Sequence, residues 1–189
     1  MNQEPLIEIQ QATAAEVCEN YQPEKEATQL LRDGISRQEF VAALLDKKRY
    51  VDAIDFIAHA LPVRDGIWWG CLCMQHALGD DLAPPDRAAA AAAVRWLMQP
   101  TEENRAAAKA PGEAADPLSP AGAVATAVWQ TGGSMAPPNA PPEPPSRFAP
   151  AQAVARAVKL ASIKMERVVA ETQRCYVELG IEVARGALK

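Results

Sequence analysis

The feature that constrains the fold most is the apolar stretch at residues 67–74, with the sequence Ile-Trp-Trp-Gly-Cys-Leu-Cys-Met. A helix with this sequence has no polar face, so it is stable in water only when other elements surround it. Pro62 precedes the stretch and Gly79 follows it, and both residue types break helices. We therefore expect a central helix, capped by Asp65, inside a bundle.

Signals for helix starts recur along the rest of the chain. Thr13–Glu16 and Ser36–Glu39 match capping boxes, in which a hydroxyl and a carboxylate satisfy amides of the first turn. Pro84-Pro85 and Ser119-Pro120 place proline where a helix tolerates it. With apolar residues at helical spacing, these signals predict an all-α protein, either a compact multi-helix bundle or an irregular array of helix pairs.

The boundaries of three further helices are also expected. Pro23 should open a helix that Gly34 ends, and Pro62 should end a helix that covers 50–61. Thr101 should cap a helix near Glu102–Ala110, which Pro111-Gly112 interrupts.

The expected organisation has four parts. Residues 1–11 form an N-terminal arm, in which 6–9 could be extended, and residues 12–134 form the helical body. Residues 135–150 form a proline-rich extended strap, because such a run favours polyproline II and excludes a helix. Residues 151–189 supply C-terminal helices that pack on the same body.

Three interpretations of the strap remain open. It is a solvated linker, a rigid segment packed on the body, or a polyproline ligand for a partner. If it is packed, Met135 and Phe148 are its apolar anchors and the residues between them lie across a groove. Residue types suited to a partner surface are Trp68, Met135, Pro137, Pro138 and Phe148.

A catalytic or metal site is not indicated. Cys71, Cys73 and His76 are close in sequence, but on a helix Cys71 and Cys73 diverge, so they are expected to be core thiols. His59 is expected near a helix C-terminus, where its partial positive charge is favourable. We expect no catalytic residue, no cofactor and no metal.

Charge and hydropathy limit the kinds of partner and the cellular location that we expect. The net charge is −5, and Lys and Arg are scattered, so nucleic acid is not expected as a partner. No apolar window is long enough for a membrane span, and the first residues lack the pattern of a secretory signal. A cytoplasmic location is expected.

Several stretches together resemble an uncharacterised bacterial family of the domain-of-unknown-function kind. They carry the patterns W-W-x-C, P-T-E-E-N-R and G-G-S-x-A-P-P, and they lie at residues 68–72, 96–107, 119–122 and 128–138. The resemblance covers about residues 60–185 and implies an association with type VI secretion gene neighbourhoods. It implies no catalytic residues.

The sequence favours a non-enzymatic interaction protein, an adaptor or accessory factor that binds another protein, here a component or effector of a type VI secretion system. One alternative is an immunity-type inhibitor of a toxin, for which an acidic surface would be expected. Another is an enzyme with a dispersed site among Cys71, Cys73, His76 and His59.

Overall fold

The computed structural model describes residues 13–79, 82–136, 139–165 and 168–188. Its helices are α1 (Ala14–Cys18), α2 (Lys25–Thr28), α3 (Arg37–Asp46), α4 (Tyr50–Ala60), α5 (Val63–Leu78), α6 (Pro84–Met98), α7 (Glu102–Ala107), α8 (Lys109–Ala114), α9 (Pro120–Trp129), α10 (Ala149–Lys164) and α11 (Val169–Ala184). Within these ranges, extended pairing is limited to an isolated antiparallel bridge between Thr13 and Ser36. The predicted all-α fold is confirmed.

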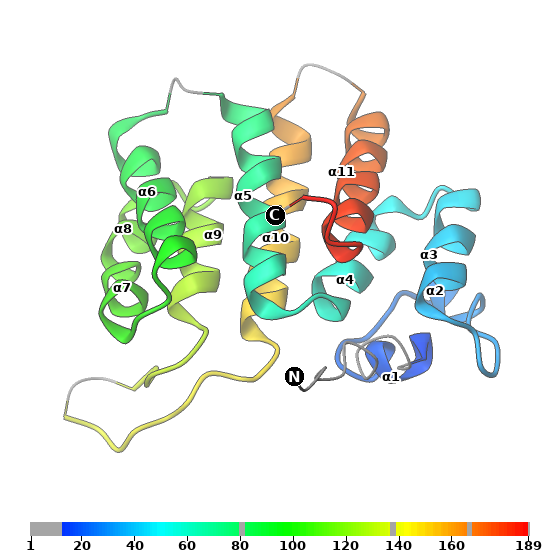
Figure 1. The fold of residues 1–189 in the computed structure, drawn as a ribbon, viewed down its shortest axis with the longest axis horizontal. Coiled ribbons are helices and arrows are strands. Elements are labelled where there is room, and N and C mark those ends of the chain that lie inside the picture. Colours follow the sequence, from blue (N-terminus) through cyan, green and yellow to red (C-terminus); the bar gives the residue numbers. More distant parts are fainter. Residues whose placement is uncertain (1–12, 80–81, 137–138, 166–167, 189) are drawn as a thin grey trace, which may run out of the picture.

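Two long helices, α5 and α10, lie side by side in the middle of the molecule (Figure 1). The group α6–α9 packs on one side of this pair, and α4 with α11 packs on the other, followed by α1–α3. Ile67, Trp69 and Cys73 of α5 are fully buried, so α5 is the central helix that its sequence predicts. In the described part of the chain, no helix is both long and apolar enough to cross a membrane.

Local capping signals place several helices correctly. Both predicted capping boxes are present: Thr13 pairs with Glu16, and Ser36 with Glu39. The hydroxyl of Ser119 accepts hydrogen bonds from the first amides of α9, those of Ala121 and Gly122. In each case the side chain satisfies amides that a helix start leaves without partners.

Other boundaries differ from the prediction. Helix α5 begins at Val63 because the Gly66 amide already donates to the Pro62 carbonyl, so Asp65 lies in the first turn instead of capping it. Pro111 and Gly112 lie inside α8, whose first turn tolerates proline because no amide is needed there. The chain bends at Ala108 instead.

The segment between Pro23 and Gly34 is less helical than expected. Only Lys25–Thr28 form a helix, α2, and it is followed by short turns at residues 29–30 and 33–34. Gly34 has φ +72°, a backbone conformation that favours glycine.

The core joins α5 to α11 through Trp69. This side chain is 0% exposed, and its indole N–H donates to the carbonyl of Tyr176 at 2.9 Å. Gly180 leaves room for it: a Cβ at this position would come within 2.9 Å of Trp69 Cε2. Trp96 is also buried, whereas Trp68 and Trp129 are half-buried.

Arginines from neighbouring elements satisfy carbonyls where other helices end. Arg64 donates to the carbonyl of Leu97 in the last turn of α6, and Arg105 donates to that of Trp129, the last residue of α9. Unpaired terminal carbonyls carry partial negative charge, so a cation is favourable there. The contact between Arg105 and Trp129 is the one that positions the candidate site.

Candidate functional site: a braced proline-rich loop

The connection between α9 and α10 forms a closed loop. The amide of Met135 donates to the carbonyl of Glu143 at 2.7 Å. The hydroxyl of Ser134 accepts hydrogen bonds from the amides of Ala136 (3.1 Å) and Glu143 (3.0 Å). We call Ser134, Met135 and Glu143 the neck, and residues 135–145 the proline-rich loop.

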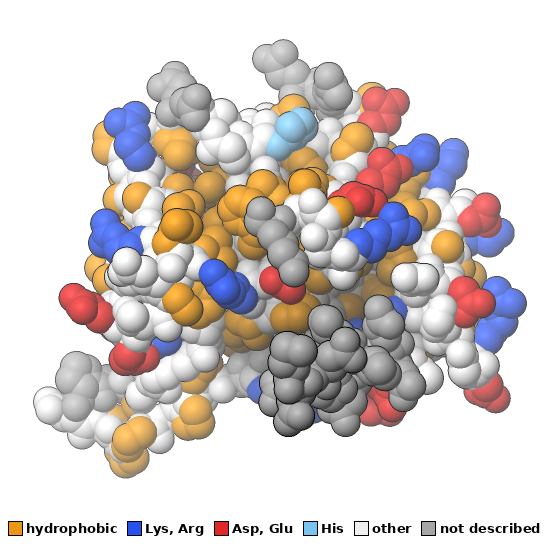
Figure 2. All heavy atoms as spheres, in the orientation of Figure 1, with side chains coloured by type: hydrophobic (Ala, Val, Ile, Leu, Met, Phe, Trp, Pro, Cys, Tyr) orange, Lys and Arg blue, Asp and Glu red, His pale blue; other side chains and the backbone are white. Residues whose placement is uncertain are grey.

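The proline-rich loop projects from the body below α6–α9 (Figure 1), and hydrophobic side chains lie along it in the space-filling view (Figure 2). Pro141, Pro142 and Pro144 are exposed. Of the three interpretations of the strap, the one in which it lies packed across a groove therefore does not hold for the exposed residues 141, 142 and 144. Proline has no amide to donate, so the loop keeps few donors, and the amides of Met135, Ala136 and Glu143 are used at the neck.

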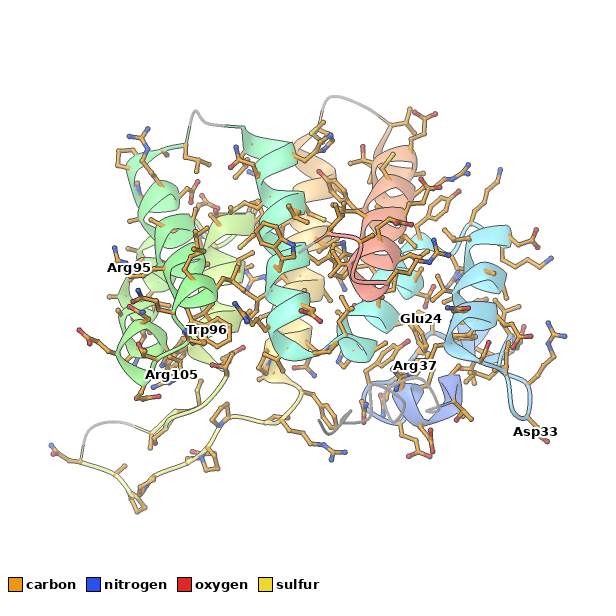
Figure 3. The ribbon with its side chains drawn as sticks, in the orientation of Figure 1. Glu24, Asp33, Arg37, Arg95, Trp96 and Arg105 are labelled. Carbon is orange, nitrogen blue, oxygen red and sulfur yellow. The ribbon has the colours of Figure 1, made fainter. Side chains whose placement is uncertain are left out.

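A buried arginine braces the segment that leads into the neck. Arg105 is 7% exposed and binds both carboxylate oxygens of Glu102, at 2.7 and 2.6 Å. Its third partner is the carbonyl of Trp129. Gly133, with φ +73°, lies against the guanidinium of Arg105, which is labelled in Figure 3, so the chain just before Ser134 packs on a side chain of α7.

The hydrogen bonds between Arg105 and Glu102 affect the charge of both groups. They lower the pKa of the Glu102 carboxyl below its usual range and raise the pKa of Arg105. Both side chains are therefore charged at neutral pH, and the bidentate geometry is of the strong, directional kind.

The other end of the connection enters the body through Phe148. Its half-buried ring lies 6.4 Å from that of His59, and the guanidinium of Arg147 lies 4.4 Å from the ring centre. His59 stacks on Tyr21 at 4.6 Å, and its Nδ1 lies 2.8 Å from the carbonyl of Asp55. Pro150 in the first turn of α10 is buried, so the loop is held at both ends.

The predicted partner-binding residues are distributed unevenly around this loop. Met135 lies at its neck and Phe148 where it enters the body, and both are half-buried. Trp68 lies on α5, and its buried indole nitrogen has no hydrogen-bond partner among the described residues. Pro137 and Pro138 lie outside the described residues.

The residues considered for catalysis are held apart or buried. Cys71 and Cys73 are buried, and burial raises the pKa of the Cys71 thiol to about 12 and that of Cys73 well above its ordinary value. Such thiols stay protonated and are poor nucleophiles. His76 lies 3.2 Å from the hydroxyl of Tyr176, whereas His59 is on α4. The described ranges contain no group of three or more potential metal ligands.

Sequence reasoning missed Arg105 and named Glu102 only as the start of an expected helix. Both residues belong to the P-T-E-E-N-R stretch, and Gly133 and Ser134 belong to the G-G-S stretch. The signal that could have pointed to these residues is that each lies in a polar motif of the chain. That they meet at the base of the loop follows only from the fold.

The fold and this site define an all-α protein that presents a braced, exposed proline-rich loop. The chain belongs to a family of unknown function, DUF6931, whose model matches residues 40–184. The matched region contains Arg105, the neck and the loop, and it begins after α1 and α2. No curated protein and no solved structure matches the chain.

Proposed function

We propose that this protein is a non-enzymatic adaptor that binds another protein through its proline-rich loop. The observation that carries the proposal is the neck: two backbone amides, those of Met135 and Glu143, close the loop, while the prolines at 141, 142 and 144 remain exposed. A solvated linker needs no such closure and no buried arginine at its base.

Proline content suits this role. Each proline fixes its own φ, so an exposed proline-rich segment loses less conformational entropy on binding than an ordinary loop. Grooves lined with aromatic side chains recognise such segments in many complexes. We therefore infer a partner with an aromatic-lined groove.

More specifically, we propose that the partner belongs to a type VI secretion system. It rests on the association with type VI secretion gene neighbourhoods that the resemblance of residues 60–185 implies. The toxin-inhibitor alternative would call for a continuous acidic surface. On the face in Figure 2, acidic and basic side chains alternate over α3 and α11, which does not favour that alternative.

The test is affinity capture from the native host with three baits. They are the wild-type chain, a loop variant (Pro141→Ser, Pro142→Ser, Pro144→Ser) and a control variant (Met98→Ser, Leu118→Ser) that removes exposed apolar side chains elsewhere. The binding affinity of each bait for the recovered, purified partner is then measured.

We expect the partner to be retained by the control, while its affinity for the loop variant falls by at least about tenfold, or 1.4 kcal/mol. Equal affinity for all three baits would contradict the role of the loop. A captured partner unrelated to secretion would contradict the secretion association alone.

A further inference from the structure

An apolar groove lies on the opposite side of the α5–α10 pair from the proline-rich loop, between α3, α4 and α11. Its volume is about 490 Å³, and its lining is mainly apolar. Val41, Ala42 and Leu45 of α3 form one wall, with Ile57 of α4 and Ile181 of α11 opposite. Water in such a groove is readily displaced by an apolar side chain.

The N-terminal arm leaves the body beside this groove. Thr13 forms an antiparallel bridge with Ser36, and the Ala14 amide donates to the carbonyl of Ile35 at 3.1 Å. The residue after Ser36 is Arg37, which begins α3 and lines the groove (Figure 3). Thr13, the first described residue, is therefore paired with the neighbour of a residue that lines the groove.

The arm is long enough to occupy the groove. Residues 6–12 reach about 23 Å when extended, whereas α3 is about 15 Å long. The arm carries three large apolar residues in one short stretch, Leu6, Ile7 and Ile9. Ile7 and Ile9 share one face of an extended segment, so both can enter the groove together.

Charge at the rim matches the arm. The charged residues that line the groove are Arg37, Arg185 and Glu39, and Arg185 already pairs with Glu182 at 2.9 Å. The arm contains Glu4 and Glu8 and no Lys or Arg. The negative charge of the arm therefore meets a lining with a net positive charge, since Arg37 and Arg185 outweigh Glu39.

We propose that residues 6–9 bind in this groove of the same chain, with Ile7 and Ile9 inserted. The arm then covers a surface that would otherwise be open to other apolar segments. This interaction is independent of the proline-rich loop and of the adaptor role.

The test uses the full chain with isotope-labelled Ile, Leu and Val methyl groups. Nuclear Overhauser contacts between Ile7 or Ile9 and the methyl groups of Val41, Leu45 and Ile181 are measured over a wide range of protein concentration. The arm variant is Ile7→Ser, Ile9→Ser, and its matched control is Gln3→Ser, Gln11→Ser. A second variant, Ala42→Arg, changes the groove instead of the arm: it places a large charged side chain at an exposed position of the groove wall.

We expect contacts that do not depend on concentration, and shifts of the groove methyls in the arm variant but not in the control. Ala42→Arg should release the arm, which sharpens the signals of residues 6–9 to those of a free segment. Absence of contacts in the wild type would overturn the proposal. Contacts that are found only between differently labelled chains would assign the groove to a second copy and would also overturn it.

Discussion

Gly133 lies directly against the guanidinium of Arg105: a Cβ built on Gly133 would come within 2.7 Å of Arg105 Cζ. This contact joins two polar stretches of the sequence that are far apart along the chain. It also places Ser134, and with it the neck of the proline-rich loop, at a fixed position on the body.

Gly133→Ala should therefore destabilise the protein by about 2–3 kcal/mol, because it adds a steric conflict to an unfavourable backbone conformation. Gly34→Ala is the matched control: its φ is +72°, against +73° for Gly133, but nothing lies within 4 Å of its added Cβ. The control should lose only about 1–2 kcal/mol. Chemical denaturation measures both, and equal losses would mean that Arg105 does not press on Gly133.

Arg105→Met should lower the free energy of unfolding by about 1.5–3 kcal/mol at neutral pH, mainly because the Trp129 carbonyl loses the charged donor of a buried guanidinium; the pair with the exposed Glu102 adds little. The pKa of Glu102 is lowered in the folded state. The ionised carboxylate therefore contributes to stability at neutral pH, and this contribution is lost as the pH falls through the lowered pKa.

The stability difference between Arg105→Met and wild type should accordingly shrink in acid. Arg174→Met, which removes an exposed pair with Glu178, serves as the control and should leave stability little changed. A difference that grows as the pH falls would rule out the assigned pairing.

Substitution by alanine should lower the free energy of unfolding more at a buried tryptophan than at a half-buried one. Trp69→Ala should cost about 3–5 kcal/mol, because the side chain is fully buried and hydrogen-bonded to Tyr176. Trp129 is half-buried, and Lys109 Nζ lies 4.7 Å from its ring centre. The substitution Trp129→Ala should therefore cost only about 1–2 kcal/mol. Denaturation of both variants checks the order, and the reverse order would contradict the packing described.

In the folded chain, one of the four cysteines should react quickly with a thiol reagent, and the other three should react slowly. Cys175 is exposed, whereas Cys18, Cys71 and Cys73 are buried and their thiol pKa values are raised by burial. A chromogenic disulfide reagent at mildly alkaline pH should modify one thiol quickly in the folded chain. Cys175→Ser should abolish that fast phase, and its persistence would show that a core thiol is accessible.

Local patterns predicted much of the fold. Thr13, Ser36 and Ser119 cap helices through hydrogen bonds to residues two or three positions away, so sequence alone contains their interaction partners. The apolar stretch in α5 likewise predicted its central place. Pro111 was misjudged because a proline ends or starts a helix according to its neighbours' packing.

The site was less predictable, since it depends on contacts between distant elements. The proline content of the loop was visible, and Ser134 lies in the G-G-S-x-A-P-P pattern, but no local pattern indicates that Ser134 accepts a hydrogen bond from the amide of Glu143, nine residues later. Arg105 looked like an ordinary residue of a polar helix. Only tertiary packing places it beneath Gly133.

Hydrogen exchange at the neck tests the central claim most directly. In the wild type, the amides of Met135 and Glu143 should exchange at least roughly fivefold more slowly than an open chain, as about 1 kcal/mol of net hydrogen bonding would give. The amides of exposed Asn139 and Ala140 should exchange quickly.

Ser134→Ala should remove the protection of Glu143, whereas Ser146→Ala, which removes a serine hydroxyl outside the neck, should preserve it. That pattern is the result expected for a closed loop presented on a braced base. Equal, open-chain exchange at all four amides in the wild type would show a plain linker and would contradict the account.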